Sequence, residues 1–168
     1  MEYLSLIFLH VAFGILWAGG GIVLGLFIVP SVMDAGPAGG AVMAGVVKRR
    51  MSIILSAAAV IVVLTGLRLY MIRFTTAWLG TAEGLAIAAG AVLGIGAFVL
   101  GVFVQRPLVG RMGALAARIA ASGAPPSAEQ AAELAAMRTR LRRIASLTAW
   151  HLVGATLLMS MHRLATAF

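Results

Sequence analysis

The stretch YLSLIFLHVAFGILWAGGGIVLGLFIV, residues 3–29, decides the fold class of this chain. It contains no Asp, Glu, Lys or Arg. About 20 apolar residues, each rising about 1.5 Å, are enough for an α-helix to cross the hydrocarbon core of a bilayer. Because that core offers no water to backbone amides, such a segment can only be helical. We therefore predict a first transmembrane helix at about 3–29, ended by Pro30.

Three further apolar blocks follow, and they predict transmembrane helices at about 51–73, 83–105 and 144–167. Hydrophobic residues make up 62% of the chain and charged residues 11%. Soluble domains contain roughly half and about a quarter, respectively. We predict a single integral membrane domain over residues 1–168, surrounded by the lipid bilayer.

The basic residues are concentrated at alternate connections. The first connection carries Lys48, Arg49 and Arg50, and the third carries seven arginines, whereas the opposite side has only Arg68, Arg73 and Arg163. Connections rich in Lys and Arg stay in the cytoplasm. We therefore predict a multi-pass protein of a bacterial inner membrane with both termini periplasmic. The pI of 11.7 reflects these topology signals and headgroup contacts, so we predict no nucleic-acid partner.

The third connection, about 106–143, is the one long polar segment. Its two halves are rich in Ala, Leu and Arg and predict helices, separated by Gly123-Ala124-Pro125-Pro126. Ser127 and Gln130 have the spacing of a capping box at the second start. The predicted fold is all-α: a four-transmembrane-helix bundle with a cytosolic helical hairpin that extends helices three and four. The hairpin is either a spacer at the lipid surface or a docking site for another protein.

Histidine is the residue type in the apolar blocks that could carry chemistry. The chain has no cysteine, and no carboxylate falls deep in a block. His10 and His162 both lie roughly 9 Å below the outer edge by helix rise, and Arg68 shares that layer. His151 precedes His162 by three turns, on the same face but roughly 16 Å deeper. Ionisable residues inside a membrane are by default functional candidates.

Gly14, Trp17, Gly21 and Gly25 follow His10 at intervals of three and four residues, so they form one stripe on the first helix. Glycines in such a stripe allow a neighbouring helix to pack closely. They also leave room for a flat ligand beside the histidine. Both interpretations stay open for the stripe.

Four segments resemble a known family. Leu9-His10 and Trp17-Ala18-Gly19-Gly20 are similar to the helix-one signature of the copper resistance protein D-like superfamily of bacterial membrane proteins. Lys48-Arg49-Arg50 and Thr65-Gly66-Leu67 resemble its second helix. The His-to-Trp spacing is also similar to that of the related four-helix protoporphyrinogen oxidases, which bind b-type haem. The resemblance implies a half-size relative that holds a metal cofactor.

Three functions are compatible with these residues. In the first, His10 and His162 ligate haem b between helices one and four, and Arg68 pairs with a propionate. Such a protein would transfer electrons to quinone or a redox partner protein, or act as a haem-dependent oxidoreductase. In the second, Met159, Met161 and His162, with Met71 at the end of helix two, bind copper for transport or resistance, because thioether and imidazole suit Cu(I).

In the third, the chain is a non-catalytic accessory subunit whose histidines are structural, as a homo-oligomer or part of a membrane complex. We favour haem, because copper leaves Arg68 unexplained and puts a cation beside the metal. His151 is either a ligand of a second cofactor or the donor of a structural hydrogen bond.

Overall fold

The computed structural model describes residues 1–161, apart from the side chains of Pro37 and Val47, as six continuous helices. Two of the six contain an internal π-helical segment, labelled η. The elements in chain order are α1 (Glu2–Val23), η1 (Leu24–Ile28), α2 (Val29–Asp34), α3 (Pro37–Lys48), α4 (Met51–Arg73), α5 (Thr76–Leu79), α6 (Ala82–Val99), η2 (Leu100–Gln105), α7 (Arg106–Ser122) and α8 (Ala128–Met161).

Four of these helices are long and apolar enough to cross a membrane: Glu2–Asp34, Met51–Arg73, Ala82–Ser122 and Ala128–Met161. Their large apolar side chains point outward, as Phe8 and Ile15, both 71% exposed, illustrate. In water such a surface would be very unfavourable, whereas in lipid it is the solvated face. The predicted four-span, all-α architecture is confirmed at this level, and the protein has the features of a multi-pass membrane protein.

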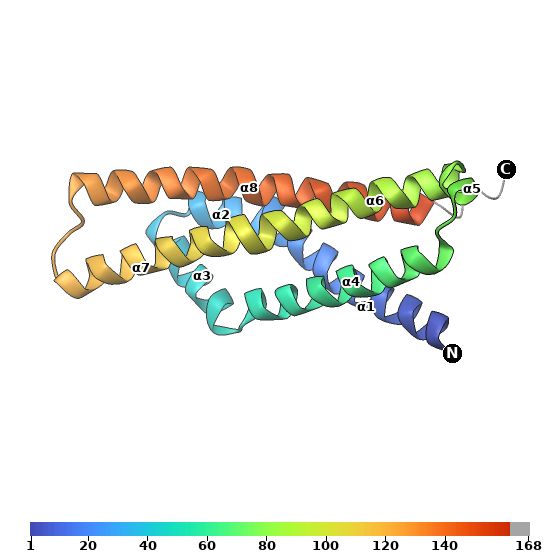
Figure 1. The fold of residues 1–168 in the computed structure, drawn as a ribbon. Helices are drawn as coiled ribbons and strands as arrows, with labels where there is room; N and C mark the ends of the chain where they lie inside the picture. The colour runs from blue at the N-terminus through green and yellow to red at the C-terminus, as the bar shows by residue number, and fades with distance from the viewer. Residues whose placement is uncertain (162–168) are drawn as a thin grey trace.

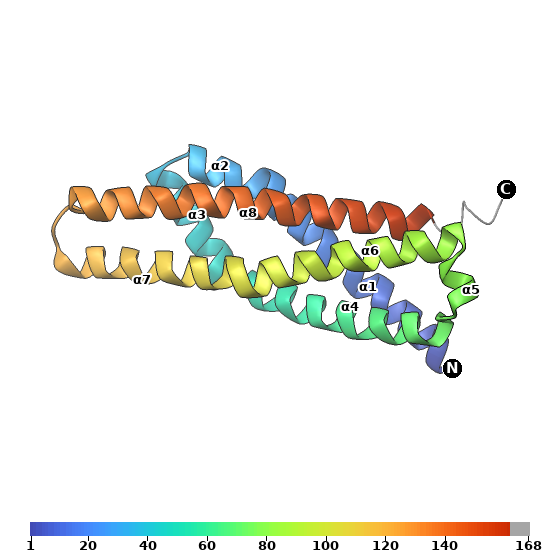
Figure 2. The same ribbon diagram turned by 45° about the horizontal axis from the view of Figure 1, so that its top comes forward.

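The four long helices form two antiparallel pairs (Figures 1 and 2). Helix α1 packs along α4, and α6 packs along α8. The two pairs contact each other mainly through α1 and η1, which also pack on α8. Helices α4 and α6 make few contacts with each other. The short helix α5 connects the pairs at the end where the N-terminus lies, and we call this the terminal end. The opposite end, which carries Lys48–Arg50 and the α7/α8 hairpin, is the arginine-rich end.

Small residues fill the contacts between the helices. The buried set consists mainly of alanine and glycine, with Leu152 the largest side chain that is fully buried. A Cβ atom on Gly25 would lie 2.6 Å from the carbonyl oxygen of Ala145 and 2.8 Å from the Cβ of Ala149. Lipid supplies no hydrophobic drive between helices, so close backbone approach and dispersion must hold them together. The glycines of η1 and α6 serve this purpose.

Proline does not end the first helix, and the prediction of an end at Pro30 is wrong. The helix continues to Asp34 through η1. In η1, the N–H of Val29 donates to the carbonyl of Leu24, five residues back. Proline has no N–H, and its ring would meet the carbonyl four residues earlier. The wider π turn accommodates both effects, so the helix passes through the proline.

The same arrangement occurs in the third span. Here η2 precedes Pro107, and the N–H of Arg106 donates to the carbonyl of Gly101. Both π segments pack on α8. The side chain of Gln105, at the end of η2, donates to Thr148 Oγ1 of α8 at 2.6 Å. This hydrogen bond therefore joins η2 to α8 in the region where α8 packs on both π segments.

The helical hairpin is confirmed as a continuation of spans three and four (Figure 1). Leu108 and Leu115 of α7 and Leu141 of α8 are buried between its two helices. Ser127 and Gln130 form both predicted capping contacts, at 3.0 and 3.2 Å. Gly123, with φ of 65°, ends α7 in the left-handed conformation that glycine adopts readily.

The connection between the first two spans contains a helix that we did not predict. Helix α3 follows a turn at Gly36, whose φ is 59°. A second turn at Arg49–Arg50 leads into α4, whose bounds, Met51–Arg73, agree with the predicted span. Arg50 has a φ of 57°, which is uncommon for a residue with a side chain. Of the basic residues of this connection, Lys48 ends α3, and Arg49 and Arg50 form the turn.

Candidate functional site

His10 lies on α1, and its half-buried ring packs against α4. Its Nδ1 atom is 3.0 Å from the carbonyl oxygen of Val62 and 3.3 Å from Thr65 Oγ1. Because a carbonyl oxygen can only accept, Nδ1 carries the hydrogen in this contact, and Nε2 holds the lone pair of the neutral ring. A Cβ atom on Gly66 would lie 2.7 Å from His10 Cε1, so the ring requires a glycine there.

The residues of the stripe predicted on α1 contact two different helices, α4 and α8. His10 faces α4, whereas Gly21 and Gly25 face α8. A Cβ on Gly21 would lie 2.6 Å from Leu152 Cδ1. Gly14 is half-buried, and nothing lies within 4 Å of where its Cβ would be. The stripe therefore contacts two different helices: α1 packs against α4 at His10 and, further along the chain, against α8 at Gly21 and Gly25. Trp17 is half-buried between the two regions.

Arg68 of α4 pairs with Glu2, the first residue of α1. The guanidinium donates to Glu2 Oε1 through Nε at 3.1 Å and Nη2 at 2.9 Å. Both side chains are more than half exposed. A second arginine at the terminal end, Arg73, pairs with Glu83 of α6 at 2.9 Å. Each of these two arginines at the terminal end is therefore paired with a carboxylate.

His151 lies on α8 and contacts α6. Its Nδ1 is 2.8 Å from the carbonyl oxygen of Leu147, one turn earlier on its own helix. A Cβ on Gly96 would lie 3.0 Å from His151 Cδ2. The ring of His151 is thus placed as that of His10 is, with one nitrogen on a backbone carbonyl and an edge over a glycine of the partner helix.

The remaining candidates lie near the end of α8. The side chain of Met159 packs on α6, because a Cβ on Gly90 would lie 2.9 Å from Met159 Cγ. Met161 is 53% exposed, as is Met71 of α4 at 63%. His162 lies outside the described residues, and so does any contact of the predicted His10–His162 pair.

Some partners of the site were missed from the sequence. Glu2 lies eight residues from His10, about 12 Å by helix rise, so the depth estimate that put Arg68 in the layer of His10 did not indicate a Glu2–Arg68 pair. Nothing in the sequence indicated that Val62 and Thr65 would contact His10. The contact with Val62 is through a backbone oxygen, which every residue has.

The donor set is compatible with an axial haem ligand. A histidine that ligates a metal usually donates its other ring N–H to a carbonyl or carboxylate, as His10 does to Val62. Within residues 1–161, Nε2 of His10 makes no hydrogen bond, and Gly14 leaves open space one turn further along α1. No group of three His, Asp or Glu side chains gathers in the described part of the chain.

The chain was also compared with known proteins, and no family model, curated protein or solved structure matches it.

Proposed function

We propose that this chain is a membrane-embedded haem b protein in which Nε2 of His10 supplies one axial ligand. The observation that carries the proposal is the hydrogen bond of 3.0 Å between His10 Nδ1 and the Val62 carbonyl. It sets the tautomer in which Nε2 can bind iron, and it fixes the ring orientation before a cofactor arrives. His162, which follows Met161 in the sequence, is the proposed second ligand.

The charges at the terminal end support the same proposal. Arg68 and Glu2 form an exposed pair, which is weak in energetic terms. Arg68 can therefore exchange Glu2 for a haem propionate at little cost. Arg73, which is held by the largely buried Glu83, would remain where it is.

Haem, when bound, would supply one-electron redox chemistry, and the proposed role of the protein is electron transfer with quinone or a redox partner protein. Copper is less well supported as the cofactor. Met159 packs on Gly90, and the thioethers of Met71 and Met161 are exposed. The described methionines therefore have separate surroundings.

The test is the absorption spectrum of the purified full-length protein, oxidised and reduced, together with metal analysis. We expect a Soret band that sharpens on reduction. His10→Ala and His162→Ala should each abolish or convert the low-spin spectrum, whereas His151→Ala should change it less. Added imidazole should restore the low-spin bands in His10→Ala, which a purely structural role of His10 would not produce. A colourless protein from haem-supplied cells, without stoichiometric metal, contradicts the proposal.

A second function, that of an accessory subunit without a cofactor, is favoured by a specific observation. His10 and His151 each already have a backbone acceptor, and Arg68 already has an anion. In this case the histidines stabilise helix pairs, and the α7/α8 hairpin docks a larger complex. The accessory-subunit function predicts a colourless purified protein without stoichiometric metal. His10→Ala would then lower the stability of the protein without any spectral change.

A further inference from the structure

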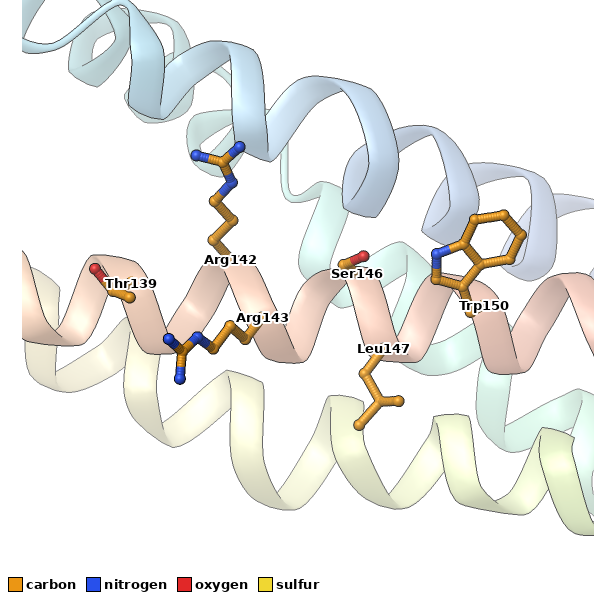
Figure 3. A pocket seen from close by; sticks show the side chains of 6 residues that line it. All are labelled: Thr139, Arg142, Arg143, Ser146, Leu147 and Trp150. Atoms are coloured by element: carbon orange, nitrogen blue, oxygen red, sulfur yellow. The ribbon is translucent and has the colours of Figure 1, made fainter.

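A depression of about 520 Å³ lies on the outward face of α8, at the border between its polar and apolar halves (Figure 3). No Asp, Glu, Lys or Arg occurs on α8 from Ile144 to Met161. The depression is lined by Thr139, Arg142, Arg143, Ser146, Leu147 and Trp150. From the first to the last of these residues it extends about 16 Å along α8 by rise per residue, so it crosses this border.

The polar half of the depression carries two guanidinium groups. Figure 3 shows Arg142 and Arg143 pointing to opposite sides of the α8 axis, with Ser146 between them and the apolar half. Arg142 is 57% exposed and lies 3.6 Å from Asp34 of α2. Arg143 forms no ion pair within residues 1–161. The net charge of this half is therefore positive, even with Asp34 counted.

The apolar half carries Leu147, 48% exposed, and Trp150, 60% exposed. Figure 3 shows them one to two turns beyond the arginines, again on opposite sides of the helix axis. Trp is enriched at the depth where headgroups meet acyl chains. An amphipathic molecule seated here would meet cations and a hydroxyl at one end and an aromatic and an aliphatic side chain at the other.

We infer that this depression binds one anionic glycerophospholipid of the leaflet at the arginine-rich end. Its phosphate would accept hydrogen bonds from Arg142 and Arg143, because a guanidinium matches phosphate oxygens in geometry and charge. Its acyl chains would lie along Leu147 and Trp150. The inference is independent of the cofactor, since the depression shares no residue with the His10 region.

The apolar half distinguishes a lipid from a free phosphate. A soluble phosphate would use the arginines alone and gain nothing from Trp150. The proposed ligand is therefore the intact lipid, and Asp34 opposes it by partly neutralising Arg142. Asp34→Asn should strengthen the preference for anionic lipid.

The test uses Trp150 as a reporter in the full-length protein, reconstituted into phosphatidylcholine vesicles. Trp17→Phe and Trp78→Phe leave it as the single tryptophan. Phosphatidylglycerol with brominated acyl chains should quench Trp150 at lower mole fraction than equally brominated phosphatidylcholine. Arg142→Gln with Arg143→Gln should reduce that preference about 25-fold, at about fivefold per arginine near a membrane surface.

A matched control removes two arginines from the other helix of the hairpin. Arg111→Gln with Arg118→Gln changes the net charge equally and should leave the preference nearly unchanged, since neither residue lines the depression. Glycerol phosphate in solution should not relieve the quenching. Equal quenching by the two lipids, equal effects of the two double variants, or displacement by glycerol phosphate would each overturn the inference.

Discussion

The imidazole of His10 occupies the space that a side chain at position 66 would fill. A Cβ on Gly66 would lie 2.7 Å from His10 Cε1 and 3.1 Å from Nδ1. The same ring atom, Nδ1, bonds to the carbonyl of Val62 one turn earlier on α4. One side chain of α1 thus uses two adjacent turns of α4, one for a hydrogen bond and one for close packing.

Gly66→Ala should therefore destabilise the α1/α4 pair. The added methyl must displace the ring, and overpacking of this kind costs about 1–3 kcal/mol. The measurement is the free energy of unfolding in mixed detergent micelles. Gly94→Ala on α6 is the control, because nothing lies within 4 Å of its Cβ position. Equal stability of the two variants would show that His10 moves aside freely.

Gly25→Ala should be more damaging than Gly21→Ala, although both glycines face α8. At Gly25 the added Cβ would meet the backbone carbonyl of Ala145, which cannot rotate away. At Gly21 it would meet the end of Leu152, a flexible side chain. We expect thermal unfolding of Gly25→Ala at a lower temperature than that of Gly21→Ala. The reverse order would mean that α1 and α8 are not held together at Gly25.

The Glu2–Arg68 pair should contribute little to stability. Its side chains are 67% and 52% exposed, and exposed pairs are worth about 0.2–1 kcal/mol. A double-mutant cycle with Glu2→Gln and Arg68→Leu measures the coupling directly. If haem is bound, Arg68→Leu should also shift the midpoint potential, and Glu2→Gln should not. A potential that is unchanged in Arg68→Leu would leave Arg68 as an anchor at the membrane surface.

We expect the arginine-rich end of the bundle to face the cytoplasm. Reporter domains fused at Pro125 should be active in the cytoplasm, and fusions after Phe168 should be active in the periplasm. The physical reason for this expectation is that connections rich in Lys and Arg are retained in the cytoplasm, and both Lys48–Arg50 and the hairpin are of this kind. The opposite activity of both fusions would place His10 in the inner leaflet.

The sequence by itself determined that the chain has four helices long and apolar enough to cross a membrane, and how the second helix of the hairpin is capped. Met51–Arg73 agrees with the predicted second span, because the length of an apolar run is set by the thickness of the bilayer. The contacts of Ser127 with Gln130 were predictable because the two residues belong to the same helical turn, three residues apart. Interactions that depend on the bilayer or on a few neighbouring residues can be derived from local sequence.

Only the tertiary structure decided which helix each face meets. Periodicity placed His10 and Gly25 on one stripe of α1, but the crossing of the helices directs His10 to α4 and Gly25 to α8. Likewise, Pro30 breaks a regular helix, yet here a π turn packed on α8 carries the chain through it. The spacing of residues on one helix is independent of the angle at which its neighbours cross. That angle is set by the close fit of small residues on several helices at once.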